Sequence, residues 1–294
     1  MIRIDGMTFG YRGRRVYDGL SMELGGRGVY GLLGRNGAGK TTLMKLIAGL
    51  LRCDGGTVSV DGAVSSMRRA EFLDRIYYLP ESLSVPDMTV AGFASAYGEF
   101  YSGYDKSFMT ECLRVFDVSP KSRLAGLSFG QKKKAFISFA LSLNVPLLLL
   151  DEPGNGLDIP SRISLRRLLS EYSVRERMVV VSTHQVRDVA DIMDHVVVID
   201  AGRLLLDVPM DVVAGKLDFV VSPEPSDKAV YSERVAGGYV HVVGRTAGSC
   251  GKGNVDVEIL FNACLAVGRQ FADLFRTDAA DSNGRNGKEV CHER

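Results

Sequence analysis

Near its start the chain passes from an apolar run into a glycine-rich turn and then into an amphipathic segment. Residues 28–33 read GVYGLL, which is typical of a buried central strand. The turn at 34–42 follows at once, and apolar side chains then recur at helical spacing over 43–51. Further apolar runs alternate with segments of helical character, at 147–150, 178–182 and 196–200. Strands that alternate with helices predict an α/β fold with a largely parallel sheet.

The glycine-rich turn has the spacing of a phosphate-binding loop. It matches G-x-x-x-x-G-K-[ST], and the segment comprises Gly34, Arg35, Asn36, Gly37, Ala38, Gly39, Lys40, Thr41 and Thr42. Glycines let the backbone curl so that successive N–H groups face phosphate oxygens, and the following helix adds the positive end of its dipole. We expect Lys40 to reach the β- and γ-phosphates and the Thr41 hydroxyl to bind Mg²⁺. The alternative is a glycine-rich turn without a ligand, which the flanking strand and helix disfavour.

A pair of acidic residues follows the apolar run 147–150. Asp151 and Glu152 would stand at the carboxyl end of that strand, the edge at which parallel α/β sheets bind ligands. Asp151 is expected to hold the metal, directly or through water, and Glu152 to orient or deprotonate the attacking water. Such a pair is more often a helix cap or a solvated turn. The loop at 34–42 reverses that preference, because a nucleotide hydrolase needs a second acid for its metal.

The stretch from about 84 to 145 differs in amino-acid composition from its surroundings. Its first part carries many aromatic side chains at loosely helical intervals. Ser128 then stands where it can cap a helix that runs to about Leu143. We therefore predict a helical subdomain over this stretch.

The domain boundaries follow from where these patterns weaken. We expect one large domain over 1–215, a small α+β extension over 216–276, and a disordered tail over 277–294, which is polar and contains glycine and asparagine. Within the extension the pattern predicts strands at 229–234, 239–244 and 255–261 and a short amphipathic helix at 263–275.

Composition argues against several kinds of protein. Lys and Arg total 36 against 35 Asp and Glu, so the net charge of +1 argues against a protein that holds nucleic acid by bulk positive charge. The five cysteines are scattered without a C-x-x-C pair, which gives no support to a zinc site or a disulfide framework. The strongest apolar run, 145–150, is far shorter than a membrane-spanning helix requires. A role at a membrane would be that of a peripheral partner of other chains.

Several segments together resemble those of ATP-binding cassette (ABC) ATPases in order and approximate spacing. They are the loop at 34–42, LSFGQ at 127–131, the strand and acids at 147–152, GLD at 156–158, and His184. LSFGQ is similar to the signature motif of the family, and the resemblance covers about residues 2–215. It implies a P-loop NTPase cassette with an N-terminal antiparallel β subdomain and a helical signature subdomain, to which this chain adds its C-terminal α+β extension.

The resemblance also implies a mechanism, in which two cassettes close head to tail around two ATP molecules. The Ser128 hydroxyl and the Gly130 backbone of one would contact the γ-phosphate bound to Lys40 of the other, and Gln131 belongs to the same nucleotide-contacting segment. His184 resembles the switch histidine that contacts the γ-phosphate and the region of Glu152.

Two further side chains receive roles from the resemblance. Asp158 resembles the acid of the loop that communicates across the dimer. Tyr11 resembles the aromatic residue that stacks on adenine, and Tyr17 is the alternative for that role.

Two positions depart from the family pattern. Glu81 follows the tripeptide 78–80, where the family usually has glutamine; its carboxylate can bind Mg²⁺ or water but cannot donate a hydrogen bond when ionised. Phe129 replaces a glycine of the usual signature. Neither change touches the loop lysine or the two acids, so we expect an active ATPase. The basic run 132–134 after the signature is interpreted as a solvated face, and attraction toward bound phosphate is the alternative.

The expected function is that of the ATP-binding and ATP-hydrolysing subunit of an ABC transporter, with ATP and Mg²⁺ bound. YLPE at 78–81 and GNGLD at 154–158 look most like exporter-type cassettes of bacteria. The expected partners are separate transmembrane permease subunits and a second cassette, either the same chain or a close relative, at the cytoplasmic face of the inner membrane. No nucleic acid is expected. The alternative is a soluble ABC ATPase that acts on nucleic acid or ribosomes; a non-catalytic regulatory cassette is disfavoured by Lys40 and Glu152.

Overall fold

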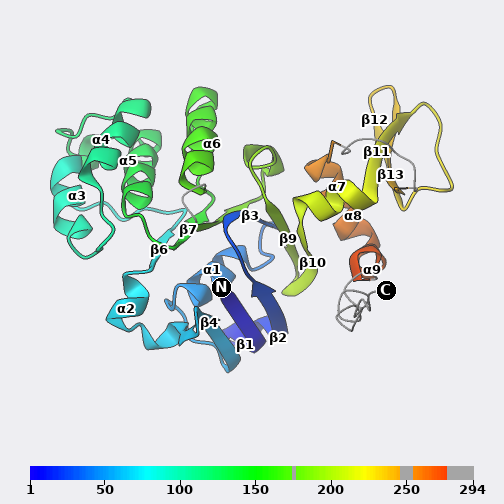
Figure 1. Cartoon of the computed structure of the whole chain (residues 1–294), viewed down its shortest axis with the longest axis horizontal. Helices are drawn as coiled ribbons and strands as arrows, with labels where there is room; N and C mark the ends of the chain where they lie inside the picture. The colour runs from blue at the N-terminus through cyan, green and yellow to red at the C-terminus, as the bar shows by residue number, and fades with distance from the viewer. Residues whose placement is uncertain (174–176, 246–253, 277–294) are drawn as a thin grey trace, which may run out of the picture. The chain divides into compact units, whose positions relative to one another are not determined.

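A computed structural model describes residues 1–173, 177–245 and 254–276 of the chain (Figure 1). The tail expected at 277–294 lies outside the described residues. The chain divides into two compact units, Met1–Asp207 and Val208–Arg294, which we call the N-terminal and C-terminal units. None of the described helices is long and apolar enough to cross a membrane.

A six-stranded sheet forms the centre of the N-terminal unit, as the α/β expectation requires. In spatial order its strands are β10 (Arg203–Pro209), β9 (His195–Asp200), β3 (Gly28–Leu33), β8 (Met178–Thr183), β7 (Leu147–Asp151) and β6 (Ile76–Leu79). Strands β9, β3, β8, β7 and β6 pair in parallel. Every residue of β3, β7 and β8 is buried, which explains why these strands read as continuous apolar runs.

A second sheet of four antiparallel strands confirms the expected N-terminal β subdomain. Its spatial order is β2 (Arg14–Leu24), β1 (Ile2–Tyr11), β4 (Gly55–Val60) and β5 (Ala63–Val64). Ile2, Ile4 and Met7 of this sheet share one core cluster with Leu43 and Met44 of α1. The same cluster includes Leu32 of β3 and Leu149 of β7, so the apolar face of α1 packs against both sheets.

The helices of the N-terminal unit include the predicted helical group. They are α1 (Lys40–Ile47), α2 (Ala70–Leu73), α3 (Val90–Gly98), α4 (Lys106–Val115), α5 (Phe129–Ser142) and α6 (Ile159–Ser173). Figure 1 shows α3, α4 and α5 gathered side by side. Phe93 and Tyr104 contact Phe139 of α5 with ring centroids 4.8 and 6.3 Å apart, so these three aromatic residues pack together between the helices.

The C-terminal unit is a small α+β structure. It contains α7 (Met210–Lys216), β11 (Leu217–Ser222), β12 (Tyr231–Val235), β13 (Gly238–Gly244), α8 (Val257–Val267) and α9 (Arg269–Arg276), with the sheet order β11-β13-β12. The strand predicted at 255–261 is wrong, because this segment lies mostly in α8. Asp256 Oδ1 accepts hydrogen bonds from the backbone N–H groups of Glu258 and Ile259, at 3.1 Å each, and so caps a helix at the place of the predicted strand.

Candidate nucleotide-binding site

The glycine-rich loop joins β3 to α1, and the backbone there requires glycine. Gly39, the residue before α1, has φ 110°, and a Cβ at this position would lie 2.5 Å from the Tyr17 hydroxyl. A Cβ on Gly34 would lie 2.5 Å from the Ile199 carbonyl oxygen. The first N–H groups of α1 have no acceptor within their own helix, and they begin at Lys40. The loop thus has the form of an anion site at a helix N-terminus.

A pocket of about 500 Å³ opens over this loop. The expected site residues that line it are Tyr11, Arg35, Asn36, Gly37, Ala38, Gly39, Lys40, Thr41, Thr42, Glu81 and Glu152. Ala201 and Gly202, in the turn between β9 and β10, close another side. Arg35 donates to both carboxylate oxygens of Asp200, at 3.0 and 2.6 Å, so its side chain is bound to the end of β9.

Lys40 points back into the loop. Its Nζ donates to the carbonyl oxygens of Gly34 at 2.6 Å and Arg35 at 3.3 Å, and it lies 3.7 Å from Glu152 Oε1. Burial lowers the pKa of Lys40, while the negative charges of Glu152 and Asp151 act in the opposite direction. An anionic ligand in the pocket would supply further negative charge beside this buried amine.

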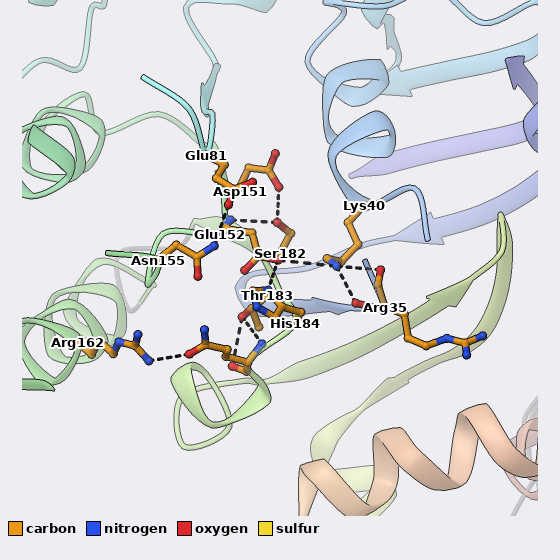
Figure 2. Close-up of polar contacts among 12 residues, drawn as sticks. Arg35, Lys40, Glu81, Asp151, Glu152, Asn155, Arg162, Ser182, Thr183 and His184 are labelled. Carbon is orange, nitrogen blue, oxygen red and sulfur yellow. Dashed lines mark hydrogen bonds and ion pairs between the residues drawn. The ribbon is translucent and has the colours of Figure 1, made fainter. Parts of the chain in front are cut away.

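Glu152 has an uncommon backbone conformation, with φ 47°. Its N–H donates to the carbonyl oxygen of Ser182 at 3.1 Å and to the Ser182 hydroxyl at 3.2 Å. Its Oε1 lies 2.9 Å from His184 Nδ1. The conformation is therefore held from the neighbouring strand β8, and it brings the expected base and the expected switch histidine into contact (Figure 2).

Asp151 is buried, and both of its carboxylate oxygens accept hydrogen bonds from neighbouring strands. The Ser182 hydroxyl donates to Oδ1 at 2.5 Å, and the Tyr78 hydroxyl donates to Oδ2 at 2.9 Å. Burial, followed by the Asp151 charge, raises the pKa of Tyr78, so this phenol remains a donor. Sequence reasoning missed Tyr78 and Ser182, because only the pairing of β6 and β8 with β7 places them beside the acid.

Glu81 and Lys133, the middle residue of the basic run 132–134, lie next to these acids. Glu81 Oε1 accepts a hydrogen bond from Asn155 Nδ2 at 2.8 Å (Figure 2). The prediction of a solvated basic face is wrong for Lys133, which is fully buried and whose Nζ lies 3.3 to 3.5 Å from three backbone carbonyl oxygens. The buried face of α5 begins at this residue and continues through Phe136 and Ile137, three and four positions further along.

The signature segment forms the start of α5. The Ser128 hydroxyl accepts from the Gln131 N–H at 3.2 Å, and Gln131 Oε1 accepts from the Ser128 N–H at 3.1 Å, which is a complete capping box. A Cβ on Gly130 would lie 2.8 Å from the Gly156 carbonyl oxygen. Ser128, Gly130 and Gln131 do not line the pocket over the loop.

Asp158 also lies outside the lining of that pocket. Its Oδ1 accepts a hydrogen bond from the Ser161 N–H at 3.0 Å at the start of α6. Hydrogen bonds from Ser161 hold the pKa of Asp158 below its ordinary value. Within one chain, then, Asp158 serves as a helix cap.

The two tyrosines considered for adenine stacking differ in exposure. Tyr11 is 45% exposed and lines the pocket, whereas Tyr17 is fully buried beneath the loop. A ring that stacks on a ligand needs an accessible face, so these positions favour Tyr11.

The residues expected to bind Mg²⁺ fit a metal that arrives with the nucleotide. Among the described residues, no group of three or more His, Cys, Asp or Glu side chains is placed to hold an ion by itself. Mg²⁺ commonly takes one or two carboxylates together with substrate phosphates and water. Thr41, Glu81 and Glu152 line the pocket and supply oxygen donors of that kind, whereas Asp151 directly precedes Glu152 and lies outside the lining.

Comparisons with known proteins agree with this geometry. Residues 17–155 match the family model described as ABC transporter. The chain is 30% identical over 220 residues to the uncharacterized ABC transporter ATP-binding protein YcbN of Bacillus subtilis, covering 74% of this chain and 72% of YcbN. It is 34% identical over 175 residues to the cytochrome c biogenesis ATP-binding export protein CcmA of Rhodopseudomonas palustris, covering 58% of this chain and 86% of CcmA.

A solved structure of an ATP-binding subunit of an ABC transporter superposes with a TM-score of 0.66 at 25% identity, over 72% of this chain and 90% of the other. The superposition agrees with the mixed sheets and helices described above, and the sequence identities above establish the family. The chain belongs to the ABC transporter family, as one of its ATP-binding cassettes, and is an ATPase.

Proposed function

We propose that this chain is the ATP-hydrolysing subunit of a transporter whose membrane-spanning subunits are separate chains. The observation that carries the proposal is the grouping of Lys40, Glu152 and His184 next to the loop pocket. In this proposal Lys40 and the loop N–H groups bind the phosphates of ATP, and Tyr11 stacks on the adenine.

The chemistry follows from the positions of the two acids. Glu152 orients the attacking water and accepts its proton, while His184 Nδ1 holds the Glu152 carboxylate in place. The new oxygen–phosphorus bond forms as the bond between the γ-phosphorus and the bridging oxygen breaks, and ADP leaves with that electron pair. Thr41, Asp151 and Glu81 would hold Mg²⁺, which neutralises phosphate charge when bound.

We further propose that two cassettes close head to tail. The signature residues Ser128 and Gly130 lie outside the lining of their own chain's pocket. A helix N-terminus with a serine hydroxyl is a suitable contact for an anionic oxygen, so a second copy would present it to the γ-phosphate. Asp158 would lie near the same interface in this arrangement.

A second pocket supports a membrane partner. It has a volume of about 780 Å³, and its lining includes Tyr77, Phe93, Tyr97 and Phe100 between β6 and the helical group. Phe100 is 77% exposed and Tyr97 is 44% exposed. We propose that a short helix of a permease subunit docks here, which places the chain on the cytoplasmic face of the inner membrane. The likeness to CcmA supports export as the direction.

Co-purification from native membranes tests the transporter assignment. The tagged chain should retain a protein whose sequence encodes several membrane-spanning helices, and Phe100→Asp should lose it because a charge cannot enter an apolar groove without cost. Leu50→Asp is the matched control, since Leu50 is 48% exposed and does not line the second pocket. Retention of the partner by Phe100→Asp would contradict the docking site, and ATP-driven uptake into inside-out vesicles would establish export.

A further inference from the structure

A lysine from the signature helix is buried next to the acids of the candidate site. Lys133 is 0% exposed, and its Nζ lies 3.4 Å from the Pro80 carbonyl oxygen, 3.3 Å from that of Glu81 and 3.5 Å from that of Asp151. One amine thus joins three parts of the molecule: helix α5, the segment after β6, and the end of β7.

Burial of this amine is costly, and its hydrogen bonds are too long to offset the cost. An amine removed from water loses solvation that must be replaced by close partners, and bonds of 3.3 to 3.5 Å are at the weak end of the range. An apolar side chain of the same length would fill the position without that penalty. The charge therefore needs an explanation other than packing.

The charges that act on Lys133 are those of the acids already described. Burial lowers the pKa of Lys133, and the negative charges of Glu81, Asp151 and Glu152, in decreasing order, oppose that effect. Glu81 brings an additional negative charge to a position where the family usually has a neutral glutamine. Three carboxylates and a polyphosphate in one site repel one another unless a cation lies among them.

We propose that Lys133 is a positioning residue for ATP hydrolysis, whose ammonium group offsets the negative charge of Glu81 and so reduces the repulsion between Glu81 and the neighbouring acids. The proposal rests on the proposed function of the site. It implies that Glu81 and Lys133 act as a pair. Loss of the lysine should lower kcat because Glu81 is charged, and it should lower kcat less when residue 81 is neutral.

Steady-state ATPase measurements on the full chain test the first part. Lys133→Met should lower kcat about tenfold, equivalent to about 1.4 kcal/mol, with KM for ATP changed less than about twofold. Its melting temperature should not fall, because methionine removes a buried charge and retains most of the side-chain volume. Lys132→Met is the matched control, since Lys132 is only partly buried and adjacent in sequence, and it should keep the wild-type kcat.

A double-mutant cycle with Glu81→Gln tests the pairing. In the Glu81→Gln background, Lys133→Met should lower kcat by less than about threefold, because the charge that the lysine offsets is gone. A purely structural lysine predicts the opposite pattern, namely the same loss in both backgrounds together with a lower melting temperature. If the methionine variant precipitates, Lys133→Gln takes its place in the cycle with the same expected coupling.

The outcomes separate this inference from the proposed function. A wild-type chain that does not hydrolyse ATP overturns both. An active wild-type chain with equal kcat in Lys133→Met and Lys132→Met, or with no coupling between residues 81 and 133, overturns only the inference.

Discussion

His184 Nδ1 lies 2.9 Å from Glu152 Oε1, and Lys40 Nζ approaches the same oxygen at 3.7 Å. The three side chains come from different elements: α1, the residue after β7 and the residue after β8. The Glu152 carboxylate is therefore held between a phosphate-binding lysine and a histidine, while its backbone occupies the left-handed region at φ 47°. Such an arrangement restricts the directions from which a water molecule can approach Glu152.

Replacement of the histidine tests this contact. His184→Ala should lower kcat about 100-fold or more, because the carboxylate loses the partner that orients it, while ATP affinity changes little. Stopped-flow or coupled-enzyme assays would give kcat, and a fluorescent nucleotide analogue would give the affinity. A variant that turns over ATP at the wild-type rate would show that the contact has no part in hydrolysis.

Glu152→Gln keeps the shape of the side chain and removes its basicity. Hydrolysis should fall about 100-fold or more, and ATP should accumulate in a dimer of cassettes, because the closed state forms but cannot be resolved by cleavage. Size-exclusion chromatography with light scattering, with ATP and then with ADP, measures the dimer. Wild-type hydrolysis by this variant would remove Glu152 from the role of base.

Lys40→Ala should weaken ATP binding by about 10- to 100-fold, since a charge-assisted hydrogen bond is worth about 1.5–3 kcal/mol. The control is Lys45→Ala, a change in the last turn of the same helix, which should bind ATP with the affinity of the wild type. Isothermal titration with ATP is the measurement. Equal affinities for all three chains would contradict the loop assignment.

Tyr78 offers a test of the metal site that leaves the metal ligands in place. Tyr78→Phe removes the donor to Asp151 Oδ2, so the Mg²⁺ concentration for half-maximal ATPase activity should rise several-fold. Tyr77→Phe is the matched control, because Tyr77 is the neighbouring tyrosine of β6 and its ring packs against Phe139 instead. The same Mg²⁺ dependence in both variants would show that the Tyr78 hydroxyl does not position the acid.

The capped start of α8 makes a prediction about stability. Asp256→Ala removes a side chain that accepts two backbone N–H groups and should cost about 1 kcal/mol of unfolding free energy. Denaturant titration measures it. Asp256→Asn should lower the free energy of unfolding much less, because the amide oxygen still caps the helix.

Much of the N-terminal unit could be predicted from local pattern. The apolar runs of β3, β7 and β8 are buried on both faces, and Ser128 with Gln131 forms a capping box that depends on nothing beyond four residues. The loop before α1 was recognisable for the same reason, since its glycines and Lys40 are adjacent in sequence.

What the sequence did not predict depends on contacts between distant segments. Tyr78 and Ser182 bond to Asp151 only because β6 and β8 flank β7. Lys133 belongs to a basic run that is typical of a solvated surface, and only the rotation of α5 buries it. The error at 255–261 has another cause: alternating apolar residues also fit a buried helix face, and the Asp256 cap decides between the two.

Strand β10 matters for anyone who shortens this protein. The two compact units meet between Asp207 and Val208, yet the strand continues to Pro209 at the edge of the six-stranded sheet. Asp207 pairs with His195 of β9 at 2.6 Å, and Val208 is buried. Truncation at the unit boundary would therefore shorten an edge strand and expose unpaired backbone groups, which promotes association between chains. A stop codon after Pro209 would leave the strand complete.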